Sequence, residues 1–289
     1  MLRVGVDSYS YHRLLGEIRP GEEDPGERFA RGSLDAVRHC RELEVDAVSL
    51  ETCFLDPPGA LDHGRLRAEA GSLELVLAWG HPDGLAFGEA PGALADLLAW
   101  IELAPRLPCR LVRMVVGSPR RRDDARIGEQ IRRTIQPLRR AAQAAEAVGV
   151  ELAVENHADL RAAELVELLE QAGEPVVGVC FDTANALRVG DDPLEAAGLL
   201  APRVRMLHLK DCTAPDGSIT GPPSVPYGDG IVPLDRVLDL LRSSDPLTCV
   251  ELGQLGAGPV DERALVADGV RWLRARAGRP AQSRCQTSG

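Results

Sequence analysis

Four apolar runs of the sequence each end in a residue type that binds metal ions. These residues are Glu155 in AVENH, Asp182 in CFDTAN, His208 in MLHLKD and Glu251 in CVELG. A single polar residue at such a place could simply begin a loop or cap a helix, but four in succession indicate a shared site. Three carboxylates gathered in an apolar place repel one another, and a divalent cation is the simplest compensation. Oxygen-rich ligation with one imidazole favours Mn²⁺ or Mg²⁺, with Co²⁺ or Zn²⁺ as alternatives.

The elements that must position these four residues are strands that alternate with helices. The intervals of 27, 26 and 43 residues between them match successive strand–helix units. Continuous apolar strands that alternate with helices are typical of a parallel sheet covered by helices. The predicted strands are 3–6, 46–50, 73–78, 111–116, 152–156, 177–181, 204–209 and 247–251. Helical spacing of apolar residues covers 35–43, 90–103, 127–148, 162–171, 234–241 and 262–275.

Eight such units predict a (β/α)₈ TIM barrel, built as a single α/β domain over residues 1–277. An open doubly wound sheet is the alternative, but no glycine-rich nucleotide-binding motif follows any predicted strand. The chemistry of such a barrel lies at the C-terminal ends of its strands, where the four residues fall. Long loops at 8–31 and 212–232 are of a kind that often forms lids or binding loops. Residues 278–289 are polar and are expected to form a disordered tail.

The composition excludes several classes of protein. Of the 289 residues, 44% are hydrophobic and 27% are charged, as in an ordinary globular protein. The net charge of −11 argues against a nucleic-acid partner or an anionic membrane partner. No apolar stretch approaches the ~20 residues of a membrane span, and Asp7 interrupts any signal-peptide core. Seven scattered cysteines without a CxxC pair indicate reduced thiols. We therefore expect a cytoplasmic protein.

Further polar residues follow the same strand ends and could contact a substrate. His157 lies two residues after Glu155 and so shares its face of the strand, with a helix-start histidine as the alternative. Asn185 could contact the substrate or cap a turn. Lys210 could reach an oxyanion or a carboxylate of the substrate, or remain a solvated loop residue.

Aromatic and charged residues at the other predicted strand ends suit the recognition of a sugar ring. Glu51 ends the second strand, and Trp79 and His81 follow the third. The alternatives are a solvated glutamate and a packed tryptophan. Tyr227 lies in the glycine-containing loop after the seventh strand, which we expect to lie over the barrel mouth. Arg113 interrupts the apolar run of the fourth strand, where it could bind substrate or pair with a carboxylate inside the barrel.

The quartet and its neighbours resemble the xylose isomerase-like TIM-barrel superfamily, and within it the sugar phosphate isomerase/epimerase family. The resemblance extends from about residue 3 to residue 274 and rests on the patterns E-N-H, D-T-x-N, H-L-K-D and E-L-G. It implies that one divalent metal is held by Glu155, Asp182, His208 and Glu251. It also implies that Glu155 and Glu251 double as the acid and the base, and relatives often form homodimers or homotetramers.

We therefore expect a divalent-metal-dependent isomerase or epimerase of a sugar or polyol. Such an enzyme moves a proton next to a carbonyl through an enediolate, with one carboxylate removing the proton and another returning it. The alternative is a metal-dependent lyase, either an inosose-type dehydratase or a C-glycoside deglycosidase acting on a 3-keto sugar. A sugar-binding subunit without catalysis is less expected, because all four ligands are present.

Two departures from family patterns bear on these alternatives. The ketose 3-epimerases carry a histidine where Asn185 stands and a glutamate where Arg161 stands. Because of these two differences, the lyase and the epimerase interpretations both stay open. The AP-endonuclease branch of the family uses three zinc ions and additional histidines. Here strand four ends without a ligand and His81 alone cannot build such a cluster, which makes DNA repair unexpected.

Overall fold

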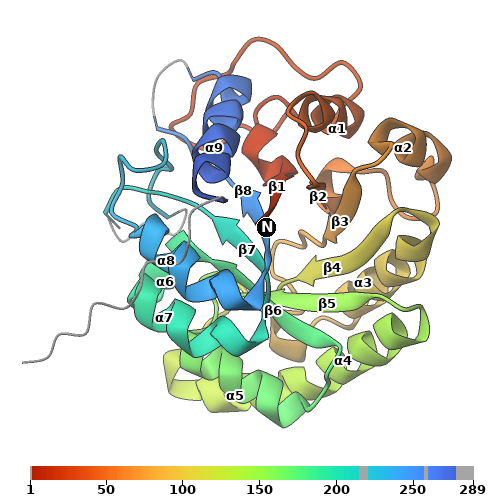
Figure 1. The fold of residues 1–289 in the computed structure, drawn as a ribbon. Helices are drawn as coiled ribbons and strands as arrows, with labels where there is room; N and C mark the ends of the chain where they lie inside the picture. Colours follow the sequence, from red (N-terminus) through yellow and green to blue (C-terminus); the bar gives the residue numbers. More distant parts are fainter. Residues whose placement is uncertain (1, 215–220, 257–259, 278–289) are drawn as a thin grey trace, which may run out of the picture.

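The computed structural model describes residues 2–214, 221–256 and 260–277. Eight parallel strands pair in chain order, and β8 pairs with β1 to close the barrel. In Figure 1 the strands surround the centre and the helices lie outside them. The prediction of a single-domain (β/α)₈ barrel is confirmed. The predicted tail, residues 278–289, lies outside the described residues.

The bounds of the elements are as follows. The strands are β1 Arg3–Asp7, β2 Ala47–Glu51, β3 Glu74–Ala78, β4 Cys109–Met114, β5 Glu151–Glu155, β6 Val177–Asp182, β7 Val204–Leu209 and β8 Leu247–Val250. The α-helices are α1 Ser33–Glu42, α2 His63–Ala70, α3 Pro91–Leu103, α4 Ile127–Ala147, α5 Ala162–Ala172, α6 Thr183–Arg188, α7 Pro193–Leu200, α8 Leu234–Leu241 and α9 Glu262–Ala277. Short 3₁₀ helices are Ser8–Tyr11, Thr52–Phe54, Ala86–Gly88, Ala104–Arg106, Asp124–Arg126, Ala201–Arg203 and Arg242–Ser244.

The sequence predicted all eight strands and six of these α-helices, but it missed α2, α6 and α7. All three are short. In α2 the only buried residues are Leu66 and Ala70, so the apolar spacing is weak. The other two begin at aspartates whose side chains accept hydrogen bonds from the first free backbone N–H groups of the helix. Capping therefore marks the start of both helices, and the buried residues Pro193, Ala196, Ala197 and Leu200 give the short α7 an apolar face as well.

Two layers of apolar side chains fill the molecule. The inner layer, inside the barrel, consists of Ala47, Val76, Leu111, Ala153, Cys180, Met206, Leu247 and Cys249. The outer layer packs between the strands and the helices. Strand β1 packs closely against β8 at Gly5, because a Cβ atom there would lie only 2.7 Å from Cys249 Sγ.

Within the described residues, no helix is long and apolar enough to cross a membrane. All six described cysteines are free thiols.

The long loop after β1 is anchored to the last helix by a buried ion pair. Arg13 Nε lies 3.1 Å from Glu262 Oε1, and both side chains are 1% exposed. The same carboxylate accepts hydrogen bonds from the backbone N–H groups of Arg13 and Leu14. His12 lies nearby and contacts Glu22 at 2.9 Å, farther along the loop. These contacts hold the loop against the barrel beside the strand ends.

Replacing Glu262 by glutamine should destabilise the fold, because Arg13 would keep a buried charge without its counter-ion. We expect the free energy of unfolding to fall by about 3 kcal/mol, measured by chemical denaturation. The control Glu170→Gln removes a carboxylate that pairs with Arg203 at the surface. It should cost less than about 1 kcal/mol. Equal losses in the two variants would contradict the anchoring role of Glu262.

Candidate active site

A polar cavity of about 440 Å³ opens at the C-terminal ends of the strands. Its position is the one expected for the chemistry of a (β/α)₈ barrel. Residues from several strand ends and loops line it, including Tyr9, Glu51, His81, Arg113, His157, Asn185, Lys210 and Glu251. Six of the eight substrate-contacting residues predicted from the sequence are therefore in the cavity wall. A cavity of this volume suits a small molecule of the size of a sugar.

The predicted metal quartet converges below this cavity. Glu155, Asp182 and His208 are at most 1% exposed, and Glu251 is 5% exposed. His208 Nδ1 lies 2.6 Å from Glu251 Oε2 and 3.9 Å from Glu155 Oε2. Ligand-type atoms of Asp182, His208 and Glu251 lie within 4.8 Å of one another. The four side chains come from the last four strand ends, as their spacing predicted.

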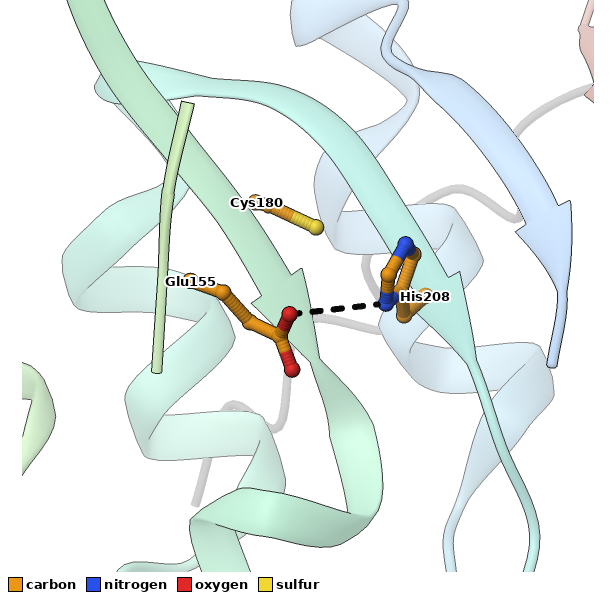
Figure 2. A group of neighbouring side chains, drawn as sticks. All are labelled: Glu155, Cys180 and His208. Atoms are coloured by element: carbon orange, nitrogen blue, oxygen red, sulfur yellow. Dashed lines mark ion pairs between the residues drawn. The ribbon is translucent and has the colours of Figure 1, made fainter. Parts of the chain in front are cut away.

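Cys180 belongs to the same group and was not expected there. Figure 2 shows Glu155 and His208 pointing toward one another from β5 and β7, with Cys180 of β6 beside them. Cys180 precedes Asp182 by two residues and therefore points to the same face of its strand, one layer deeper in the barrel. Burial raises the pKa of the Cys180 thiol to about 11. Carboxylates and one imidazole therefore make up most of the possible metal donors beside this thiol.

The quartet fits a divalent cation. Glu155 Oε2, Glu251 Oε2 and His208 Nδ1 are buried, and they are held by ion-pair contacts: Arg113 Nε lies 2.6 Å from Glu155 Oε2, and His208 Nδ1 lies 2.6 Å from Glu251 Oε2. A cation bound among these carboxylates and the imidazole would offset the repulsion between the buried charges. Oxygen donors with one imidazole favour Mg²⁺ or Mn²⁺ over softer metals.

Two cationic side chains already neutralise part of the negative charge. Lys210 Nζ lies 2.8 Å from Asp182 Oδ2 and 2.7 Å from Glu251 Oε1. These two carboxylates raise the pKa of Lys210 against the effect of its burial. Arg113 bridges the opposite side, with Nε 2.6 Å from Glu155 Oε2 and Nη2 2.5 Å from Glu51 Oε1. Arg113 therefore pairs with carboxylates inside the barrel, one of the two alternatives from the sequence.

Asn185 holds two of the carboxylates at a defined separation. Its Nδ2 atom donates to Asp182 Oδ2 at 2.9 Å and to Glu155 Oε1 at 3.1 Å. Asp182 Oδ1 also accepts from the backbone N–H groups of Ala184 and Asn185, because Asp182 caps α6. Asn185 thus orients the quartet and also lines the cavity. From the sequence alone, Asn185 could either contact the substrate or cap a turn.

His157 enters the cavity as a neutral imidazole. Burial and the nearby Arg113 cation lower its pKa to about 3. Its Nδ1 atom is buried and makes no hydrogen bond within the described residues. A neutral imidazole with an unsatisfied ring nitrogen is suited to hydrogen-bond a hydroxyl group of a ligand.

Two of the predicted aromatic contacts, Trp79 and Tyr227, do not line this cavity. Trp79 is fully buried, and its indole N–H donates to Asp96 at 2.7 Å. The Tyr227 hydroxyl donates to the backbone carbonyl of Leu209 and accepts from the backbone N–H of Glu251. Tyr227 therefore joins the ends of β7 and β8, and Trp79 packs outside the barrel. His81, stacked on Trp79, does line the cavity.

Asp7 is a site residue that the sequence reasoning missed. It lies at the end of β1 with no exposed surface, and its Oδ2 atom is 3.5 Å from His208 Nε2. Ser49 Oγ donates to the same oxygen at 2.5 Å, and the backbone N–H of Tyr9 donates to the other. A carboxylate behind a ligand histidine holds the ring and its tautomer. The rule that found the quartet, an acid at a strand end, also applies to Asp7.

Asp7→Asn should weaken metal binding, because it removes the carboxylate charge that lies 3.5 Å from His208 Nε2, behind the ligand ring. We expect the dissociation constant for Mn²⁺ to rise by about 10- to 100-fold, measured by titration calorimetry on metal-free protein. The control Asp96→Asn changes a carboxylate that contacts Trp79 outside the cavity. Unchanged Mn²⁺ affinity in Asp7→Asn would rule out this role.

Comparisons with known proteins agree with the geometry. The family model described as xylose isomerase-like TIM barrel matches residues 37–276. The 2-epi-5-epi-valiolone 7-phosphate 2-epimerase of Actinoplanes sp. is 32% identical over 228 residues, 75% of this chain and 80% of the relative. Inosose dehydratase 1 of Bacillus cereus is 29% identical over 96 residues, only 29% of this chain and 32% of the relative.

A solved structure with the same fold is similar over nearly its whole length. It is a xylose isomerase-like TIM-barrel protein from Mycobacterium smegmatis in complex with magnesium, with a TM-score of 0.68 and 17% identity over 96% of each chain. At this identity the likeness shows the fold alone. Because the family model spans most of the barrel whose strand ends carry the quartet, this chain belongs to the xylose isomerase-like TIM-barrel family.

Proposed function

We propose that this protein is a divalent-metal-dependent epimerase or isomerase that transfers a proton next to the carbonyl of a keto sugar or keto-cyclitol. The observation that carries the proposal is the quartet itself, three carboxylates and a histidine buried under a polar cavity of sugar size. The epimerase relative that spans 75% of this chain supports the same reaction class. The proposal includes a small-molecule substrate, no nucleic-acid or membrane partner, and a homodimer or homotetramer of the kind that relatives often form.

The two proposed proton-transfer residues are Glu251 and Glu155. Glu251 lines the cavity, so its carboxylate can reach a carbon bound there. Glu155 is more enclosed, because Arg113 and Asn185 both contact its carboxylate. Two strands, β6 and β7, separate β5 from β8 in the barrel, so the two carboxylates approach from different directions. Epimerisation requires such a pair, one group to remove the proton and one to return it on the other face.

Other residues of the cavity would orient the substrate. The neutral imidazole of His157 can hydrogen-bond a hydroxyl group, and Lys210 can stabilise negative charge that develops on a substrate oxygen. Glu155, Asp182, His208 and Glu251 would hold the metal ion, with Mg²⁺ or Mn²⁺ favoured by the donors. When bound, such an ion supplies Lewis-acid stabilisation of an enediolate.

Glu251→Gln should abolish most of the proton transfer, because glutamine cannot accept the proton. Incubation with a keto-cyclitol or ketose in D₂O should place deuterium next to the carbonyl with the wild-type protein. We expect the rate of incorporation to fall by about 10²- to 10⁴-fold in the variant, measured by NMR. The control Glu167→Gln alters an exposed residue of α5 and should leave the rate unchanged. Equal rates in Glu251→Gln and the wild type would refute this role.

Metal content provides an independent measurement. Elemental analysis of purified protein should find about one divalent ion per chain in the wild type and much less in His208→Ala. Chelation of the wild-type metal should stop deuterium incorporation, and Mn²⁺ or Mg²⁺ should restore it. Equal metal content in both proteins would exclude the quartet as the binding site.

A dehydratase is a second candidate, favoured by the environment of Glu51. This carboxyl group lines the cavity, and burial raises its pKa to about 8 in spite of Arg113. A carboxyl group that is protonated near neutral pH can donate its proton to a departing hydroxyl group. Inosose dehydratases are among the relatives. Loss of water from an inosose, slowed by at least tenfold in Glu51→Gln, would favour this reaction over epimerisation.

A further inference from the structure

We infer that Asp159 is a positioning residue of the active site, which holds a strained turn and thereby fixes His157 in the cavity wall. This inference rests on the proposed function, because it concerns how the same cavity binds a hydroxyl group of its substrate. Asp159 follows the end of β5 by four residues and has no exposed surface. It does not line the cavity, so its effect on a ligand must pass through another residue.

The strained turn lies directly after His157. Ala158 has a φ of +57°, in the left-handed region that a residue with a Cβ atom rarely adopts. Such a conformation persists only where the surrounding contacts fix it, and it is frequent at functional sites. Ala158 is itself buried, whereas His157 lines the cavity. The strained backbone is therefore next to a side chain that a substrate would meet.

Three backbone N–H groups converge on the Asp159 carboxylate. Its Oδ1 atom accepts from His157 at 3.0 Å and from Leu160 at 2.9 Å, on the two sides of the turn. Its Oδ2 atom accepts from Gly117 at 2.9 Å, in the segment that follows the neighbouring strand β4. A buried carboxylate is costly without such donors, and hydrogen bonds to a charged acceptor are strong. One side chain therefore closes the turn and ties it to the next strand end.

The chain before His157 is fixed as well. The side chain of Asn156 bonds the carbonyl and the backbone N–H of Asp182, at 2.9 and 2.7 Å. Asn156 thus holds the segment to β6 on one side, and Asp159 holds it to Gly117 on the other. His157 lies between these two anchors, so its backbone has little freedom. The direction in which the imidazole enters the cavity is set by both of them.

A hydrogen bond between His157 and a substrate depends on this placement. Hydrogen bonds weaken steeply when the distance grows or the angle is poor. His157 Nδ1 is buried and makes no hydrogen bond within the part of the chain that the structure describes, so a ligand hydroxyl group is a suitable partner. Loss of the turn would weaken that bond, whereas the contacts of the quartet do not involve Asp159. We therefore expect Asp159 to affect substrate binding more than proton transfer.

Steady-state kinetics of the full-length, metal-loaded protein tests this role, with the ketose or inosose that the wild type exchanges fastest in D₂O. Asp159→Ala should raise KM about fivefold, as for the net loss of one hydrogen bond. It should change kcat by less than about twofold, because the lost contact is made in the ground state as well. The control Asp192→Ala removes a carboxylate that also accepts from two backbone N–H groups, but at the start of α7 outside the cavity wall. It should keep the wild-type KM, and an unchanged KM in Asp159→Ala would overturn the inference.

Two combined variants distinguish the turn from a general loss of structure. Glycine adopts the left-handed conformation without strain, so Ala158→Gly/Asp159→Ala should return KM to within about twofold of the wild-type value. In a His157→Gln background, Asp159→Ala should raise KM no further, because both changes remove the same contact. The glycine variant still tests the turn if Asp159→Ala alone does not fold. A persistent rise of KM in the glycine variant, or an additive effect with His157→Gln, would refute positioning through His157.

The NMR resonances of the His157 ring separate this inference from the proposed function. They are assigned in Mg²⁺-loaded protein by their loss in His157→Gln. They should shift in Asp159→Ala and return in the glycine variant. Absence of exchange with every ketose and inosose would contradict the proposed function, and the resonances would still decide how His157 is held. Unchanged resonances in Asp159→Ala would overturn the inference, whichever reaction the protein catalyses.

Discussion

The burial of three carboxylates at one end of the barrel is the constraint on which the rest of the site depends. Glu155, Asp182 and Glu251 are almost completely removed from solvent. Like charges at this separation in a medium of low polarity are strongly destabilising unless cations lie among them. Lys210 and Arg113 supply two positive charges from within the chain, and neither contacts all three carboxylates. A divalent ion bound among these groups would supply the remainder.

The positions of these groups follow from the barrel and from contacts between adjacent strand ends. The parallel register sends the last residues of β5 to β8 to a common end. Asn156 then joins two of these strands, since its side chain bonds both the backbone N–H and the carbonyl of Asp182. Tyr227 joins the other two through Leu209 and Glu251. Hydrogen bonds of this kind, between side chains and backbone, keep the carboxylates in place although the carboxylates repel one another.

Apolar runs and spacing predicted the barrel and its strands because continuous burial is a property of each strand by itself. The same logic identified the quartet, since each member directly ends such a run. Trp79 does not line the cavity, because strand position does not determine to which side an aromatic ring packs. Tyr227 does not line it either, because a loop sequence does not show that its hydroxyl group bonds to the strand ends. Asp7 meets the same strand-end rule but was not assigned to the site, whereas Cys180 was missed because it precedes the strand end and its role depends on His208, a neighbour distant in sequence. Contacts of this kind depend on tertiary structure, which one sequence does not display.

The two glutamates of the quartet differ in what holds them, and this difference bears on their chemistry. Glu155 is bound by Arg113, whose own position is secured by Glu51 and by the backbone carbonyl of Trp79. This buried guanidinium fixes the orientation of the Glu155 carboxylate. Glu251 is paired with Lys210, a side chain with many rotamers that also reaches the cavity. Although burial raises it, Lys210 and His208 together lower the pKa of Glu251 well below its usual range, so the proposed role of Glu251 as a base requires a ligand that draws Lys210 away from its carboxylate.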